Sequence, residues 1–352
     1  MEEIVTLAQN HLQAKLPFVL YCKPNSEAGI GFFQQNDTVF EVNDYTEKGF
    51  VIATFDGAKT YLIPESASAV VHFSLDKKVM TNSQQEVIEV NTNSKINFEA
   101  LVAKGIEAIN NDEFKKVVLS RSEKVDLAEF DLIATFKKLI QRYPSTFVYC
   151  FYHPKIGTWL GATPEQLLKV KDTYFETISL AGTQIDTGSS EIIWGEKEKE
   201  EQQFVTDYIV SKVENVATAV RYTKAYSIKA GSIWHIRTDV SGQLNSDSSL
   251  KKVIGLLHPT PAVCGLPKEN SKAFIVKNEQ YDRSFYTGFL GELNCNFTTS
   301  TNSSDLYVNL RCMQIKGLQA YLYMGCGITK DSIPAKEWEE SVNKSMTMKK
   351  VL

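Results

Sequence analysis

Lys116 is the first residue of the chain whose setting could support acid–base chemistry. It opens the run Lys116–Arg121 (Lys-Val-Val-Leu-Ser-Arg), whose β-branched residues predict a strand. Strand alternation places Lys116 on the same face as Val118, so the lysine points the same way as a residue expected to be buried. A lysine serves as a general base only where its neutral form is accessible. The ordinary alternative is a solvated lysine at a strand end, because most lysines are exposed.

Glu165 is a candidate proton donor for the same chemistry. Thr163 can cap a helix, Pro164 suits its first position, and Gln166, three residues past the cap, completes a capping box. The pattern predicts a helix with Glu165 in its first turn, at the carboxyl end of a strand, where backbone often meets ligand. The alternative is a glutamate that only interacts with the positive end of the helix dipole.

Three glutamates on two further predicted helices could hold a metal ion. Glu201 ends the charged run 196–201, at the edge of an apolar stripe formed by Phe204, Tyr208, Ile209, Val213, Val216, Ala217 and Val220. Glu337 and Glu340 share one face of a last helix that begins near Pro334 and packs through Trp338, Val342 and Met346. Carboxylates from two elements suit Mg²⁺, and together with a base and an acid they indicate an anionic substrate held by magnesium. A solvated stripe with a Glu340–Lys344 ion pair is the alternative.

One large α/β unit is expected to position these residues. The chain has 352 residues, of which 43% are hydrophobic and 23% charged, so a well-packed core is expected. Apolar residues from Phe98 follow helical spacing until Asn111-Asp112, and Phe147–Tyr152 predicts a strand. We find no repeat or linker, so we predict a single domain over 1–352, with 1–95 as scaffold and 96–352 carrying the motifs.

Composition and charge exclude several classes of function. The net charge is −4 and basic residues form only short pairs, which argues against a nucleic-acid partner. Clean apolar stretches reach about six residues, far below the ~20 of a membrane helix, and no leader opens the chain, so we expect no membrane partner and a cytoplasmic location. The six cysteines and five histidines lack metal-site spacing, and glycine-rich nucleotide motifs are absent.

Eight ordered blocks of sequence resemble the chorismate-utilising enzymes, and among them the isochorismate synthases. The blocks are Lys116–Arg121, Gly161–Glu165, Leu180–Thr183, Leu257–Gly265, Phe285–Gly288, Leu310-Arg311, Gly325–Ile328 and Glu337–Glu340. The match covers about residues 95–352. It implies an α+β fold with α/β-type layers, in which two β-sheets pack face to face between outer helices.

The resemblance also implies a role for each candidate residue. Lys116 would activate water and Glu165 would be the general acid, while Glu201, Glu337 and Glu340 would bind Mg²⁺ as the cofactor. The residues implied to bind the substrate chorismate are Thr183, His235, Ala262, Tyr286, Arg311, Gly325, Gly327 and Lys344. Arginine's planar fork matches a carboxylate, and glycine lets the backbone approach a ligand. Where many relatives have Glu-His, this chain has Glu201-Gln202, which puts a neighbouring polar contact in doubt.

The reaction implied is the reversible, Mg²⁺-dependent conversion of chorismate to isochorismate, with water added at C2 and the C4 hydroxyl lost. Isochorismate feeds menaquinone and siderophore biosynthesis alike, and no glutamine amidotransferase subunit is expected. The first alternative is a salicylate synthase, which goes on to expel pyruvate. Aminating relatives lack the lysine or carry one where this chain has Ala181. A non-catalytic Mg²⁺-dependent binder would not need both Lys116 and Glu165.

Overall fold

The computed structural model of the protein describes residues 1–75, 92–186, 192–230 and 233–352. The helices within these residues are α1 (Glu2–Ala14), α2 (Thr92–Asn110), α3 (Leu132–Arg142), α4 (Glu196–Val213), α5 (Leu250–Leu257), α6 (Lys268–Asn278) and α7 (Pro334–Lys349), with a 3₁₀ turn η1 (Glu65–Ala67). The strands are β1 (Phe18–Cys22), β2 (Ala28–Gln34), β3 (Phe40–Glu41), β4 (Gly49–Ala53), β5 (Thr60–Pro64), β6 (Ser68–Ser74), β7 (Lys116–Asp126), β8 (Phe147–His153), β9 (Gly157–Thr163), β10 (Gln166–Lys171), β11 (Tyr174–Ile185), β12 (Ala217–Tyr222), β13 (Tyr226–Ala230), β14 (Ile233–Leu244), β15 (Gly265–Leu266), β16 (Phe289–Leu293), β17 (Ser303–Val308), β18 (Cys312–Lys316) and β19 (Gln319–Ile328).

The strands form two large antiparallel sheets. The first has the order β15-β7-β19-β18-β9-β8-β1-β2-β6, and the second has the order β12-β14-β11-β10-β17-β16-β4-β5-β3, with β13 paired to β14. The chain passes from the first sheet to the second between β9 and β10, at Pro164 and Glu165. Strands from the N-terminal third complete both sheets, since β1 pairs with β8 and β4 pairs with β16.

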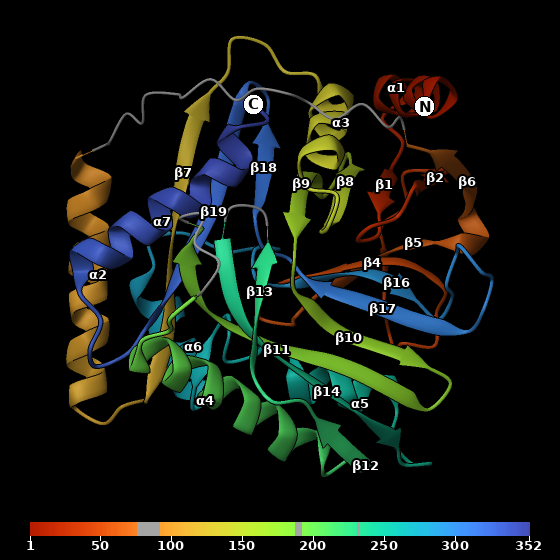
Figure 1. Ribbon diagram of the computed structural model, residues 1–352. Helices are drawn as coiled ribbons and strands as arrows, with labels where there is room; N and C mark the ends of the chain where they lie inside the picture. Colours follow the sequence, from red (N-terminus) through yellow and green to blue (C-terminus); the bar gives the residue numbers. More distant parts are fainter. Residues whose placement is uncertain (76–91, 187–191, 231–232) are drawn as a thin grey trace.

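The sheets pack face to face, and the helices cover their outer faces (Figure 1). An aromatic cluster that includes Tyr21, Phe50, Phe147 and Trp159 fills the space between the sheets. Outside the first sheet, α2 packs on β7, α3 on β8, and α7 on β19, while α4 and α5 lie over the second sheet. This arrangement confirms the predicted fold class.

Several predicted elements are confirmed, and their boundaries follow the sequence signals. Helix α2 ends at Asn110, where the apolar spacing stops, and β8 contains the predicted strand Phe147–Tyr152. Helix α4 begins inside the charged run, as expected for a first turn. Its predicted stripe was too long, because α4 ends at Val213 and residues from Ala217 form β12, which pairs with β14.

The predicted helix at Glu165 is wrong. Thr163 ends β9, and Gln166–Lys171 forms β10, which pairs with both β11 and β17. The apolar residues Leu167, Leu168 and Val170 are buried in this strand. Pairing on two sides outweighed a local capping signal worth roughly 1 kcal/mol.

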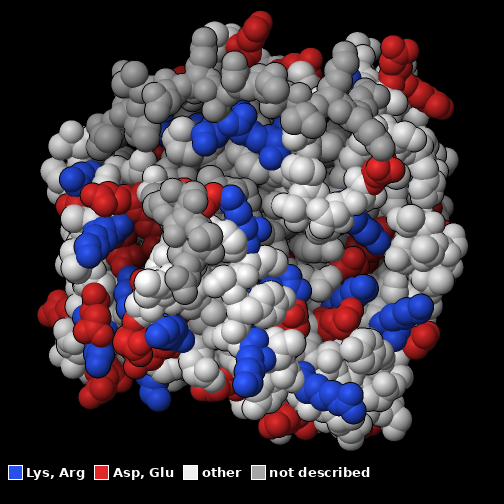
Figure 2. Space-filling view, viewed as in Figure 1, with Lys and Arg blue, Asp and Glu red and all other residues white. Residues whose placement is uncertain are grey.

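The surface shows mixed charge on the face seen in Figure 2. Basic and acidic side chains are interspersed there, in keeping with a net charge of only −4. Among the described residues, none of the helices combines the length and the apolar character that crossing a bilayer requires.

Candidate active site

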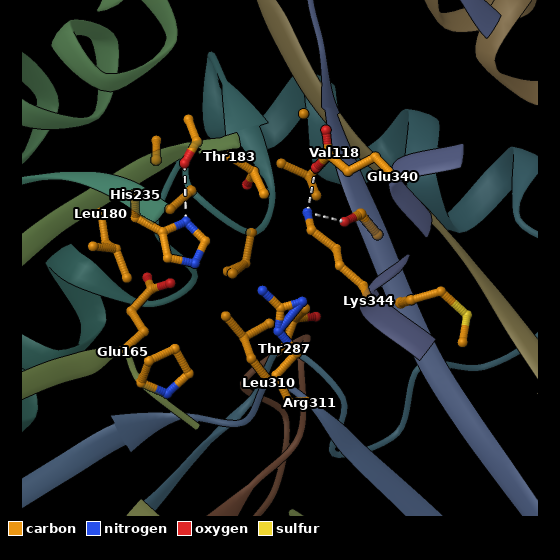
Figure 3. Close-up of a pocket in the computed structure, with 18 of the residues that line it drawn as sticks. Val118, Glu165, Leu180, Thr183, His235, Thr287, Leu310, Arg311, Glu340 and Lys344 are labelled. Atoms are coloured by element: carbon orange, nitrogen blue, oxygen red, sulfur yellow. Dashed lines mark hydrogen bonds and ion pairs between the residues drawn. The ribbon is translucent and has the colours of Figure 1, made fainter. Parts of the chain in front are cut away.

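Most of the predicted site residues line one cavity of about 80 Å³, and they come from both β-sheets and from α4 and α7. All of them line the cavity except Lys116 and Glu337, which are buried beside lining residues. Figure 3 shows His235 and Glu165 on one side, Glu340 and Lys344 on the other, and Arg311 between them. The structure therefore brings these residues together, and their individual roles stay predictions.

Glu165 reaches the cavity from the crossing between the two sheets. Thr163 fixes this crossing, because its Oγ1 donates to the Val308 carbonyl at 2.6 Å and accepts from the Glu165 amide at 3.3 Å. The Glu165 side chain is buried, and burial raises its pKa to about 8 although Lys116, Arg311 and Lys344 oppose this shift. The carboxyl group therefore holds a proton near neutral pH, as a general acid requires.

Lys116 lies at the start of β7 and is completely buried, as strand parity predicted. The adjacent Lys115 is exposed, and Val118, two residues on, lines the cavity. The Lys116 Nζ is 3.1 Å from Glu201 Oε1 in an ion pair, but it has no hydrogen bond to any described residue. A buried amine with unused donor positions is costly unless a ligand or water completes its contacts.

The three glutamates form an acidic group around the end of β19. Oxygens of Glu337 and Glu340, one turn apart on α7, lie within 4.8 Å of each other, together with the Cys326 Sγ. Burial and the nearby Glu340 raise the pKa of Glu337, while Lys197 opposes this shift. Burial would likewise raise the pKa of Glu340, but Lys344 and other cations hold it below its ordinary value.

Glycine at position 327 brings the third glutamate of this group into place. A Cβ on Gly327 would lie 2.2 Å from Glu201 Oε1, so a side chain here would displace the carboxylate of α4 from its place against β19. The candidate donors are therefore the carboxylates of Glu337 and Glu340 on α7 and, from α4, that of Glu201. Carboxylate oxygens are ligands that Mg²⁺ prefers in proteins.

Arg311, Lys344 and Tyr286 give the cavity its capacity to bind an anion. Lys344 Nζ contacts Glu340 Oε1 at 2.5 Å and donates to the Gly325 carbonyl at 2.8 Å. Arg311 is held with φ +46° in the turn before β18, so it lies outside a regular strand. Burial raises the pKa of Tyr286, which therefore keeps its hydroxyl proton for donation. A Cβ on Gly325 would lie 2.8 Å from the Tyr286 hydroxyl.

A bulge in β11 orients His235 and places Thr183 at the cavity. The β11–β14 register shifts between Ala181 and Gln184, and Gly182 adopts φ +72°, which favours glycine. The Gly182 carbonyl lies 2.9 Å from His235 Nδ1, and burial lowers the pKa of His235 to about 3. The ring is therefore neutral and donates from Nδ1, so its Nε2, unpartnered among the described residues, is left as a hydrogen-bond acceptor.

Gln202, where many relatives have histidine, is only 2% exposed and is not a lining residue of the cavity. Its Nε2 lies 2.9 Å from both Thr206 Oγ1 and Thr238 Oγ1 and 3.3 Å from Ser179 Oγ. Gln202 therefore ties α4, the helix that carries Glu201, to β11 and β14.

Sequence reasoning missed part of the lining. The residues concerned are Val118, Pro164, Leu180, Ala181, Gly182, Val263, Thr287, Leu310, Tyr323 and Met324. Most are direct neighbours of predicted site residues within the same blocks, so block membership was the available signal. Lys197 was also missed. Its Nζ lies 2.5 Å from Glu337 Oε1.

Comparisons with known proteins agree with this geometry. The family model for chorismate binding enzymes matches residues 45–352. Isochorismate synthase EntC of Escherichia coli is 28% identical over 296 residues, which cover 81% of this chain and 73% of the relative. Anthranilate synthase component 1 of Thermococcus kodakarensis is also 28% identical, over 72% of this chain and 60% of its own.

The fold has a matching counterpart among solved structures. MenF, the menaquinone-specific isochorismate synthase of Escherichia coli, superposes with a TM-score of 0.78 at 19% identity, over 96% of this chain and 88% of that one. With the family model covering residues 45–352 and the site residues gathered in one cavity, the chain belongs to the chorismate-binding enzymes.

Proposed function

We propose that the protein is an isochorismate synthase, which adds water at C2 of chorismate and removes the C4 hydroxyl in a reversible, Mg²⁺-dependent reaction. The observation that carries the proposal is a carboxyl with a raised pKa, Glu165, in the lining of the cavity and a buried amine, Lys116, beside residues of that lining. Two relatives with this activity in their names, EntC and MenF, support the choice.

Glu165 supplies the proton that the departing hydroxyl needs. Hydroxide is a poor leaving group, so a positioned acid must protonate the C4 oxygen as the bond breaks. The pKa of about 8 keeps Glu165 protonated at neutral pH. The reverse reaction uses the same group as a base, which accounts for a reversible exchange of one hydroxyl for the other.

Lys116 prepares the incoming water. Its Nζ has no hydrogen bond to any described residue, so it can engage water in the neighbouring cavity. Lys116 must accept a proton from that water as the oxygen attacks C2, so it acts in its amine form. Glu201, 3.1 Å away, fixes the position of the Nζ.

Arg311 and Lys344 match the two carboxylates of chorismate. Both line the cavity, and Tyr286 adds a hydroxyl donor beside them. A guanidinium donates two parallel hydrogen bonds to a carboxylate, which would orient the enolpyruvyl side chain. The neutral His235 presents Nε2 as an acceptor, which suits a substrate hydroxyl.

Glu337 and Glu340 would hold Mg²⁺, because their oxygens lie within 4.8 Å of each other at the end of β19, and Glu201 would complete the set from α4. When bound, the ion supplies positive charge for the ring carboxylate of the substrate. Lys197 and Lys344 already pair with Glu337 and Glu340, which helps to keep these buried carboxylates stable without a divalent ion.

The competing activities differ in nucleophile and in product. The similarity to anthranilate synthase component 1 of Thermococcus kodakarensis is an argument for an aminating synthase. Two residues argue against it. The cavity has Ala181 where aminating relatives place a lysine, and Lys116 is present. A salicylate synthase would use the same acid and base and then expel pyruvate. The block Leu257–Gly265 resembles the synthases that stop at isochorismate, and its Ala262 and Val263 line the cavity.

The test is product identification with purified protein, chorismate and Mg²⁺. We expect isochorismate, with the same final mixture reached from either chorismate or isochorismate and without ammonia. Stoichiometric salicylate and pyruvate, above the background of a heat-inactivated control, would overturn the proposal in favour of a salicylate synthase. Anthranilate formed only with ammonia would favour an aminating synthase.

A further inference from the structure

Each glutamate of the acidic group is paired with a lysine of this chain. Glu201 pairs with Lys116 and Glu340 pairs with Lys344, and both of these lysines already have places in the proposed mechanism. The remaining pair joins Glu337 to Lys197 at 2.5 Å. Lys197 does not line the cavity, and nothing in the proposed chemistry requires it. The ion pair of Lys197 with Glu337 therefore needs an explanation other than a role in the reaction.

Lys197 occupies an unusual position for a lysine. It belongs to the first turn of α4, where Gly195 is the N-cap without a side-chain cap. The helix dipole places positive charge at this end, so a lysine is disfavoured unless acidic neighbours compensate. Burial would lower the pKa of Lys197, but Glu337, Glu201 and Glu340 raise it above its ordinary value, so the side chain is an ammonium. All three glutamates of the group thus act on this one cation.

The partner of Lys197 needs a cation at all times. The Glu337 side chain is only 2% exposed, and one of its oxygens lies within 4.8 Å of a Glu340 oxygen. Two carboxylates at this spacing repel each other, and a buried carboxylate without a counter-charge is strongly disfavoured. The ammonium of Lys197 meets this need while its own side chain stays 28% exposed, with a route back to solvent.

We propose that Lys197 is an internal counter-cation that competes with the divalent ion for Glu337. It holds Glu337 when no ion is bound and gives up that contact when the ion binds. Lys197 therefore weakens metal binding while stabilising the metal-free protein. The inference rests on the proposed function in one respect, namely that Glu201, Glu337 and Glu340 hold Mg²⁺.

The two effects have opposite signs, which separates this role from that of an ordinary ion pair. In Lys197→Met the ammonium is lost and the alkyl stem is kept. We expect the metal-free variant, in a chelator, to unfold a few degrees below the wild type. We expect its Mg²⁺ affinity to rise about fivefold, the upper size of a partly exposed ion pair. If Lys197 only positioned Glu337, both the unfolding temperature and the affinity would fall.

The measurement is the unfolding temperature of the full chain against Mg²⁺ concentration, without substrate and again with saturating chorismate. Lys199→Met is the matched control, since Lys199 lies on the same helix, is 55% exposed and pairs with the 92% exposed Glu196. It should leave the affinity unchanged. Lys197→Arg keeps the positive charge and should bind Mg²⁺ no more tightly than the wild type. If Lys197→Met fails to fold, tighter Mg²⁺ binding by Lys197→Arg would still count against the inference.

Each outcome decides the matter. Tighter Mg²⁺ binding in Lys197→Met alone supports the inference, whereas unchanged or weaker binding overturns it and leaves the magnesium site standing. If Mg²⁺ does not stabilise the wild type under either condition, the magnesium part of the proposed function fails, and the inference fails with it.

Discussion

Glu165→Gln should change how the stability of the protein depends on pH. The pKa of Glu165 is raised from 4.5 to about 8 by burial, so between these values the folded chain holds a proton that the unfolded chain has released. Stability from this group is therefore greatest below about pH 4.5, falls as pH rises towards about 8, and is level above that. Glutamine has nearly the same shape and no proton to lose, so the variant should lack this decline.

The magnitude follows from the size of the shift. A displacement from 4.5 to about 8 corresponds to about 5 kcal/mol of unfolding free energy over the full window, of which about half falls between about pH 6 and pH 9. The free energy of unfolding of Glu165→Gln, relative to the wild type, should therefore rise by about half of that amount between these two pH values. Urea unfolding followed by tryptophan fluorescence measures this difference.

The pH dependence of kcat is an independent test of the protonation of Glu165. The kcat of the wild type should fall as pH rises through about 8, because the general acid is lost, and Glu165→Gln should be slower than the wild type by about 10²–10⁴-fold below that pH. Glu339→Gln, at an exposed glutamate of α7, is the control and should keep the wild-type slope of stability against pH. Identical slopes for the wild type and Glu165→Gln would mean that Glu165 is ionised in the folded protein and cannot donate a proton at neutral pH.

Three further outcomes follow from the site. Lys116→Ala should lower kcat by about 10²–10⁴-fold while Lys115→Ala, at an exposed position just before β7, stays active; an inactive Lys115→Ala would contradict the role assigned to Lys116. Glu340→Gln should raise the Mg²⁺ concentration needed for half-maximal activity, and wild-type activity should vanish in a chelator; full turnover in metal-free buffer would refute the magnesium site. Gly327→Ala should lower activity and Mg²⁺ affinity, since its Cβ would meet Glu201 Oε1 at 2.2 Å, and an unchanged Mg²⁺ titration would show that Glu201 is not a ligand.

Local sequence patterns predicted those parts of the site whose structure is set by neighbouring residues in the chain. Strand alternation placed Lys116 on the face of Val118, and the structure decides against the solvated alternative, since residues on both faces of this part of β7 are buried; α7 begins at Pro334 as the sequence indicated. The predicted packing face of α7 was only partly right. Trp338 is buried, but Val342 and Met346 are half-buried, while Glu337 and Ser341 are buried. This helix lies against both β19 and α2, and a second packing partner is not visible in the helical period.

Long-range pairing determined what local patterns could not. Gln166–Lys171 became a strand because β17, more than a hundred residues later, pairs with it. Likewise, no spacing in the sequence shows that Gly325 and Gly327 lie opposite Ser120 and Val118. These cross-chain neighbours bring the carboxylates and the lysines to one cavity. The roles of the substrate-binding residues were accordingly inferred from family blocks.

The strand order has a consequence for how the chain must be synthesised. In the first sheet, β7 stays without its partner β19 until nearly the whole chain has left the ribosome, and β16 and β17 complete the second sheet almost as late. During translation, the strands made early therefore present open edges, which are prone to associate with other chains. Such long-range pairing also slows folding. Production of this protein should consequently depend on chaperone supply and on expression temperature, and a chain that stops before β19 should aggregate rather than persist as a soluble fragment.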